Sequence, residues 1–260
     1  RWRREKMLLS FDNIQKSFTF ALKEKDFALN LVIGGILYLI TGCLQQVMKI
    51  NKNILENTPE ILVVVVIFIL ISLILNIFTN GYPLVCANNY LHKRKPVMPR
   101  WSNISGIMLT GLKATIISIL YYIPSLALIA ISAMITLLLN QPNLIILLLP
   151  VNLVVIITSL FFMFMAMIIF LKRLSITDAL DFSLISKILS QYLVDLFLLI
   201  LVMLGISLLI GLLSFLLCIT CVGIILIPFI TFYSQLVFTN IMAQFYEKIF
   251  QPKSQKEEIE

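Results

Sequence analysis

Amide and hydroxyl side chains are the polar groups that this sequence places within or beside its longest apolar stretches. The candidates are Asn76, Asn80, Asn152, Thr231, Gln235, Thr239 and Asn240. Thr231, Gln235 and Thr239 advance four residues at a time, so they share one face of a helix. An unpaired amide in hydrocarbon costs several kcal/mol, so we expect this face to turn inward and to meet Asn152 and Asn76. Direct hydrogen bonds between helices and a polar pocket for a ligand both stay open.

A second pattern with possible chemistry is Cys218–Ile219–Thr220–Cys221, two cysteines separated by two residues. In a soluble thioredoxin-like protein this spacing marks a redox-active pair. Here the pair lies in a short uncharged link between two apolar stretches, where the small thiol side chains also pack well. Packing, a disulfide and a redox role all stay open from the sequence.

The groups that usually carry catalysis or bind metals are missing from the middle of the apolar stretches. The single histidine, His92, lies in a basic segment, and Asp195 lies at the start of an apolar stretch. A catalytic triad or a metal site needs several such groups together. No phosphate-binding Gly-x-x-x-x-Gly-Lys-Ser/Thr motif occurs either. We therefore expect no catalytic residue, no cofactor and no metal, in a protein that is not an enzyme.

The composition places these polar residues in a membrane protein. Of the 260 residues, 60% are hydrophobic and 13% are charged, and the mean hydropathy is +1.02. Soluble domains are about 45–50% apolar and about 25% charged. The 4 cysteines are too few for a disulfide-stabilised secreted domain. The composition therefore excludes a soluble enzyme, a disordered tail and a small secreted domain.

Six apolar stretches are long enough to cross about 30 Å of hydrocarbon as helices. They lie near Phe27–Met48, Ile61–Asn80, Thr115–Leu139, Leu144–Leu171, Leu193–Leu217 and Val222–Ala243. Short links between stretches predict antiparallel pairs, so the expected fold is an all-α integral membrane protein with six transmembrane helices in three hairpins. We expect a single membrane domain over residues 1–260, in which 1–26 form a cytoplasmic interfacial segment, 27–246 the six-helix bundle and 247–260 a charged cytoplasmic tail.

The positions of lysine and arginine predict the orientation of these helices. Apart from Lys49 and Lys52, the 20 basic residues fall in the N-terminal segment, in the links after the second and fourth stretches, or in the tail. Cytoplasmic segments are enriched in lysine and arginine, so we expect a multi-pass protein of the cell membrane with both termini cytoplasmic. Topology explains the net charge of +7 without nucleic acid, and the basic face is expected to contact anionic lipid head groups.

Each pair of apolar stretches follows a short segment with one apolar face. These segments are Ser10–Leu22, Ser102–Leu112 and Ser175–Leu189, and each begins with a serine, which suits the start of a helix. Asp178 also has the spacing from Ser175 that a capping box requires. The apolar residues recur every three or four positions. Because the segments are too short and too polar to span a bilayer, we expect three cytoplasmic interfacial amphipathic helices.

Several short motifs follow one another in a recognisable order. They are Phe20–Asp26, Leu31–Leu37, Asn80–Gly81–Tyr82, Met98–Pro99–Arg100–Trp101, Gly111–Leu112–Lys113, Tyr121–Tyr122–Ile123–Pro124, Tyr233 and Gln244–Phe245–Tyr246. With them the chain resembles, over nearly its whole length, a family of uncharacterised six-span membrane proteins. That family is abundant in methanogenic archaea and is catalogued only as a domain of unknown function. The resemblance implies six spans and no established activity, so it implies no catalytic residue.

Two functions are compatible with these features. The first is a non-catalytic, permease-like bundle that handles lipids or other hydrophobic molecules. Pro124, Pro150 and Pro228 support it, because each frees a backbone carbonyl inside an apolar stretch. The second is an accessory or scaffold subunit that binds a partner protein in the membrane, and the lack of deep charges supports it. A cavity reached by Asn152 and Gln235 would favour the first function, and a fully packed bundle the second.

Overall fold

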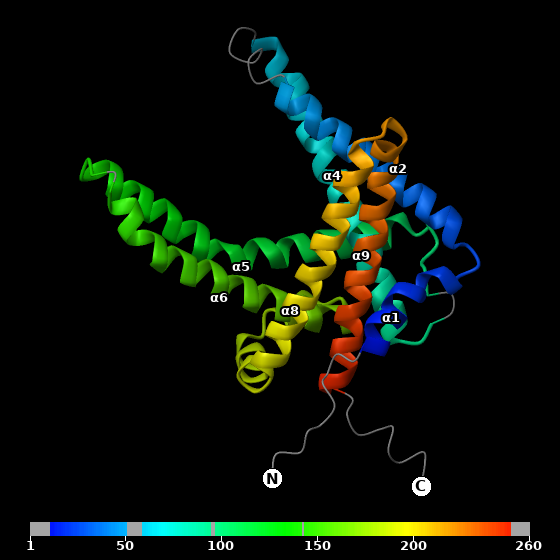
Figure 1. Ribbon diagram of the computed structural model, residues 1–260. Helices are drawn as coiled ribbons and strands as arrows, with labels where there is room; N and C mark the ends of the chain where they lie inside the picture. Colours follow the sequence, from blue (N-terminus) through cyan, green and yellow to red (C-terminus); the bar gives the residue numbers. More distant parts are fainter. Residues whose placement is uncertain (1–10, 51–58, 95–96, 142, 251–260) are drawn as a thin grey trace, which may run out of the picture. The chain divides into compact units, whose positions relative to one another are not determined.

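The computed structural model describes residues 11–50, 59–94, 97–141 and 143–250. All regular elements in this part of the chain are helices, and it contains no β-strand (Figure 1). Its elements are α1 (Phe11–Thr19), the 3-10 helix η1 (Ala21–Lys23), α2 (Phe27–Ile50), α4 (Pro59–Leu91), α5 (Ile104–Leu138), α6 (Leu144–Arg173), α7 (Ile176–Ala179), α8 (Phe182–Cys218) and α9 (Cys221–Phe250).

Six helices are long and apolar enough to cross a membrane, namely α2, α4, α5, α6, α8 and α9. Each corresponds to one of the predicted stretches. The prediction of an all-helical chain with six candidate spans is therefore confirmed over the described residues, and the length and hydropathy of these helices indicate a multi-pass membrane protein.

Some helices extend beyond the predicted spans. α4 passes Asn80, Gly81 and Pro83 before it ends at Leu91. An internal proline removes one backbone donor without necessarily ending a helix, and polar residues such as Asn88 limit how far a bilayer can cover a helix, not the helix itself. The edge of an apolar stretch therefore marks the edge of a span, while the helix continues past it.

The chain packs as two compact units, which we describe separately. The first unit comprises Arg1–Leu112 and Val194–Glu260, and the second comprises Lys113–Leu193. In the first unit, α2, α4 and α9 lie side by side (Figure 1). Their core contains fully buried Tyr82 and Phe232. Gly34 allows α2 to approach α9 closely, since a Cβ atom there would overlap the ring of Phe232.

Two glycines bring α4 and the first turns of α5 into backbone contact. A Cβ atom on Gly81 would overlap the carbonyl oxygen of Ile107, and one on Gly111 would overlap the carbonyl oxygen of Ile77. Small residues allow this kind of close helix approach. The Gly-Tyr and Gly-Leu-Lys motifs of the sequence therefore meet at one helix crossing.

In the second unit, the rest of α5 packs against α6 (Figure 1). Ser125 Oγ donates to Ser159 Oγ at 2.8 Å. The helices are joined by a short turn at Asn140, which has the left-handed φ of 49°. Asparagine tolerates this conformation better than most residues.

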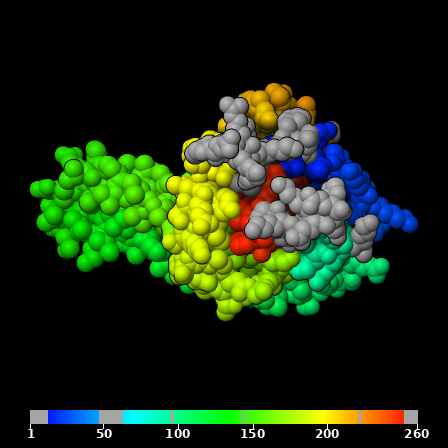
Figure 2. All heavy atoms as spheres, turned by 90° about the horizontal axis from the view of Figure 1, so that it is seen from below, coloured from blue at the N-terminus to red at the C-terminus, as the bar shows by residue number. Residues whose placement is uncertain are grey.

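The first predicted interfacial segment forms α1 and η1, with Ser10 outside the described residues. Its buried side is protein-facing, because Ser17 and Ala21 are fully buried. Figure 2 looks onto this end of the first unit, where the blue N-terminal segment lies beside the red end of α9. Contact with a membrane surface stays a prediction for its outer side.

The second predicted segment is not a separate helix. Residues 104–112 are the first turns of α5, which continues without a break into its apolar part. No proline lies between Gly111 and Pro124, so nothing in the sequence forces the helix to stop. Asn103, rather than Ser102, caps this helix, because Asn103 Oδ1 accepts a hydrogen bond from the Gly106 amide at 3.3 Å.

The third predicted segment divides differently. α7 is a single turn, and residues 182–189 belong to α8. The break between them lies at residues 180–181. α8 itself is kinked further on, at Tyr192, whose φ of −122° and ψ of 22° are not helical. Ser175 makes no capping hydrogen bond. Asp181 takes that role for α8, because its Oδ1 accepts from the Leu184 amide at 3.0 Å.

Candidate functional site

The predicted polar residues of α4 do not form a shared cluster. Asn76 Nδ2 donates to the carbonyl oxygen of Ser72, one turn earlier, at 2.9 Å. Asn80 is exposed, and within the described residues no hydrogen bond involves its side chain. Asn76 is therefore satisfied inside its own helix, whereas Asn80 offers an amide to its surroundings.

The polar line on α9 has two different parts. Thr231 Oγ1 donates to the carbonyl oxygen of Ile227, and Thr239 Oγ1 to that of Gln235, each at 2.9 Å. Threonine hydroxyls commonly bond the preceding turn in this way. The Gln235 side chain is half-buried and has no hydrogen-bond partner in the described part of the chain. No hydrogen bond joins Gln235 to Asn76 within the first unit, and the expected pairing of Gln235 with Asn152, which lies in the second unit, stays a prediction.

Asn152 has a partner in the second unit. Its side chain and the Ser132 hydroxyl lie 3.2 Å apart through both the amide oxygen and the amide nitrogen. This contact joins α5 to α6, seven residues along α5 from the Ser125–Ser159 contact. A spacing of seven residues keeps both pairs on one helix face. The arrangement matches structural hydrogen bonding between helices.

Asn240 belongs to a buried polar network that the sequence showed only in part. Gln244 Nε2 donates to Asn240 Oδ1 at 2.8 Å and to Ser17 Oγ at 2.7 Å, and Ser17 Oγ lies 3.0 Å from Asn240 Oδ1. The sequence pattern did not identify Ser17, although it lies between Ile14 and Ala21 on the apolar face of the predicted segment Ser10–Leu22. A small polar residue on an apolar stripe was the available signal. The network fixes α1 to α9.

Two buried donors remain without a hydrogen-bond partner among the described residues. They are Asn240 Nδ2 and Trp101 Nε1. Trp101 stacks on Tyr82 with ring centroids 4.1 Å apart and planes inclined by 13°. The Tyr82 hydroxyl donates to the carbonyl oxygen of Pro99 at 3.0 Å. The Gly-Tyr and Pro-x-Trp motifs therefore form one aromatic core in the first unit.

The N-terminal segment is also tied to the link between α4 and α5. Glu24 Oε1 accepts a hydrogen bond from the Val97 amide at 3.0 Å. The carbonyl oxygen of the same residue, Val97, accepts a hydrogen bond from Asn89 Nδ2 of α4 at 3.0 Å. The Tyr233 hydroxyl of α9 donates to the carbonyl oxygen of Phe18. Three elements distant in sequence thus meet at one end of the first unit.

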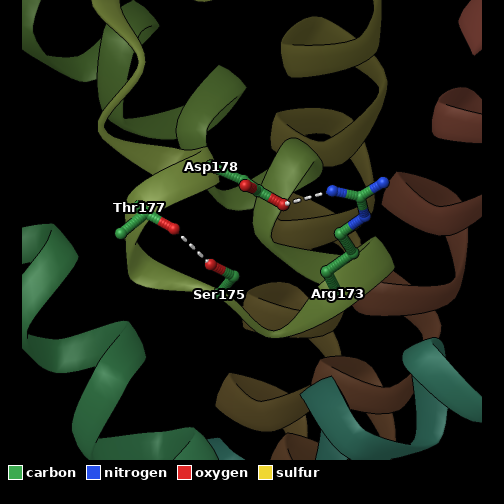
Figure 3. A network of polar contacts seen from close by, with 4 residues as sticks. All are labelled: Arg173, Ser175, Thr177 and Asp178. Atoms are coloured by element: carbon green, nitrogen blue, oxygen red, sulfur yellow. Dashed lines mark hydrogen bonds and ion pairs between the residues drawn. The ribbon is translucent and has the colours of Figure 1, made fainter.

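The second unit contains a polar turn directly after α6 (Figure 3). Arg173 and Asp178 form an ion pair at 3.6 Å, and the hydroxyls of Ser175 and Thr177 lie 2.7 Å apart. Arg173 is 75% exposed, so this pair contributes about 0–1 kcal/mol. The Lys113 ammonium of α5 donates to a carbonyl of the same turn, that of Leu174, at 3.0 Å. These contacts fix the turn rather than assemble catalytic groups.

The described residues contain neither a paired cysteine nor a cluster of metal-binding side chains. Cys218 is an exposed free thiol, and the side chain of Cys221 lies outside the described part. Within the described ranges, no three histidine, cysteine or acidic side chains gather as metal ligands would. Most of the candidate polar side chains thus form hydrogen bonds within or between helices. The side-chain amides of Asn80 and Gln235 have no hydrogen-bond partner among the described residues.

Comparison with known protein families gives a match over the middle of the chain. A family model described as "Protein of unknown function (DUF4013)" matches residues 62–219. This range is more than half of the chain and runs from α4 to the link after α8. Searches of curated proteins and of solved structures gave no match.

Proposed function

This chain belongs to DUF4013, a family of proteins of unknown function, and from that premise we propose that it is a non-catalytic, multi-pass protein of the cell membrane. Its proposed role is to handle lipids or other hydrophobic molecules in a permease-like way. In this proposal the spans form three hairpins, both termini are cytoplasmic, and α1 and the first turns of α5 and α8 lie at the membrane surface. The basic ends of the helices then face anionic lipid head groups, and nucleic acid has no part.

The observation that carries the proposal is that the side-chain amide of Gln235 has no hydrogen-bond partner among the described residues. It lies within a helix that is long and apolar enough to span a membrane, and it is half-buried. An amide without a partner in hydrocarbon costs several kcal/mol. A lipid ester, a head group or another amphipathic molecule supplies the missing hydrogen bond. Asn152 differs in this respect, because Ser132 already satisfies it.

Comparing Gln235→Leu with Asn152→Leu tests this assignment. If Gln235 binds lipid, Gln235→Leu reduces the lipid retained after detergent purification and leaves thermal stability nearly unchanged. Asn152→Leu, the matched control, lowers stability by about 1 kcal/mol because it removes a bond between helices, and it leaves lipid retention unchanged. Retained lipid is counted by mass spectrometry and stability by thermal unfolding. Lower stability of Gln235→Leu with unchanged lipid would instead identify Gln235 as a packing residue.

The second candidate is an accessory or scaffold subunit for a membrane protein partner. The pairs Ser125–Ser159 and Ser132–Asn152 favour it. In both pairs, polar side chains of α5 and α6 bond one another, so they are not available to line a ligand pocket between these helices. Purification of the full chain in mild detergent separates the two candidates. A stoichiometric partner protein supports the accessory role, and selective lipid without protein supports lipid handling.

A further inference from the structure

In the first unit, exposed basic side chains flank the two segments that the Glu24–Val97 hydrogen bond joins. They are Lys23, Lys25, Lys93, Arg94 and Arg100, which we call the basic shoulder. Residues 91–104 contain no acidic residue. Besides His92, they contain two lysines and two arginines, namely Lys93, Arg94, Lys95 and Arg100. Lys95 lies outside the described residues. Clustered cations of this kind raise the local concentration of anions.

The backbone around the shoulder is held by specific hydrogen bonds. Glu24, between Lys23 and Lys25, accepts from the Val97 amide at 3.0 Å and is half-buried. The Arg94 amide donates to the carbonyl oxygen of Asn89 at 3.0 Å, in a turn where Lys93 has a φ of 51°. η1 and the link after α4 are therefore joined, while the flanking cations stay exposed.

The one exposed acid between η1 and α2 is Asp26, so positive charge predominates on the shoulder. Large apolar side chains adjoin it, with Leu22 and Leu29 exposed by 56% and 61%. Leu29 leads along α2 to exposed Val32 and Ile36. A ligand that matches this surface is anionic at one end and apolar at the other. A soluble acidic protein does not explain why exposed leucines adjoin the lysines.

We propose that the basic shoulder binds the head group of an anionic phospholipid, with Leu22 and Leu29 against its acyl chains. The phosphate lies between the cations of η1 and those of the link between α4 and α5. Glu24 is a positioning residue here, because it joins these two elements without contacting the lipid. This inference rests on the proposed lipid handling and adds the class of lipid and its place on the protein.

The first test measures lipid selectivity of the full chain in detergent by native mass spectrometry. Phosphatidylglycerol and phosphatidylcholine are the probes, and we expect the wild-type chain to retain phosphatidylglycerol preferentially. Lys93→Ala/Arg94→Ala should weaken phosphatidylglycerol binding about thirtyfold, since each basic residue near an anionic surface contributes about 1 kcal/mol and about 1.4 kcal/mol is tenfold. The matched control is Arg173→Ala/Lys187→Ala, which removes two exposed cations from the second unit.

Equal losses in the two double variants would overturn the proposal, because general charge would then explain the binding. Displacement of the lipid by millimolar inorganic phosphate would overturn it as well and would indicate a site for a soluble anion. The proposed function has a separate readout, since Gln235→Leu changes the total lipid retained and these variants change the preference for anionic lipid. Failure of one is therefore distinguishable from failure of the other.

The second test separates geometry from charge at Glu24. Glu24→Gln removes the negative charge but keeps an oxygen that accepts from the Val97 amide, so we expect phosphatidylglycerol binding to persist. Glu24→Ala also makes the shoulder more positive but breaks the link to Val97. We expect Glu24→Ala to bind phosphatidylglycerol several-fold more weakly than Glu24→Gln. Equal or tighter binding by Glu24→Ala would overturn the proposed site.

Discussion

Glycines in this chain differ sharply in what surrounds them. Gly81 and Gly111 sit where the backbones of α4 and α5 touch, so an added methyl group overlaps a carbonyl oxygen of the facing helix. Gly205 and Gly211 on α8 have open space within 4 Å. Identical residues in equally apolar helices therefore have opposite tolerance to substitution, and the sequence alone does not distinguish them.

Gly81→Ala should consequently destabilise the protein, by about 1–3 kcal/mol, because the two helices must move apart. Gly211→Ala should be neutral or stabilising by up to about 1 kcal/mol, because alanine favours helix and meets no neighbour. Thermal unfolding of both variants in the same detergent measures the difference. Equal stability of the two variants would contradict the close backbone contact at Gly81.

Among the helices, α1 shows how a short amphipathic segment is held by polar groups. Ser17, Asn240 and Gln244 form the buried network that joins it to α9. Asn240→Leu removes the oxygen that accepts from Gln244, so we expect the amides of α1 to exchange hydrogen faster, by about tenfold for a loss near 1.4 kcal/mol. Hydrogen exchange with mass spectrometry measures this change.

Asn80→Leu is the control for that experiment, because the exposed Asn80 side chain has no hydrogen bond in the described part of α4. It should leave exchange in α1 unchanged. Unaltered exchange in Asn240→Leu would show that apolar packing around Ala21, rather than the network, holds α1 in place.

Helix length and helix pairing follow from different properties of the sequence. Six spans were predictable, because their length and hydropathy alone set them apart. The union of residues 104–112 with the following span was not, because a short amphipathic pattern looks the same whether it ends in a loop or continues. Asn152 and Gln235 looked equivalent in the sequence. Only tertiary contacts show that Asn152 is hydrogen-bonded to Ser132, whereas the Gln235 side chain has no hydrogen-bond partner among the described residues.

For the whole chain, the distribution of basic residues predicts which ends of the helices face the cytoplasm. In a background without the native cysteines, Asn140→Cys should react with a membrane-impermeant thiol reagent on intact cells, because the turn after α5 is expected to lie outside. Arg173→Cys should react only after the membrane is opened, although Arg173 is 75% exposed. The reverse labelling pattern would invert the proposed topology.

The seam between α5 and α6 also bears on how the chain enters a membrane during synthesis. Ser132 emerges from the ribosome before Asn152, and each leaves a polar group unsatisfied until its partner arrives. A short turn at Asn140 brings the partner close as soon as the second helix has been made. We expect the two helices to leave the insertion channel together as one loop of chain, so that lipid never has to accommodate the asparagine of α6 alone.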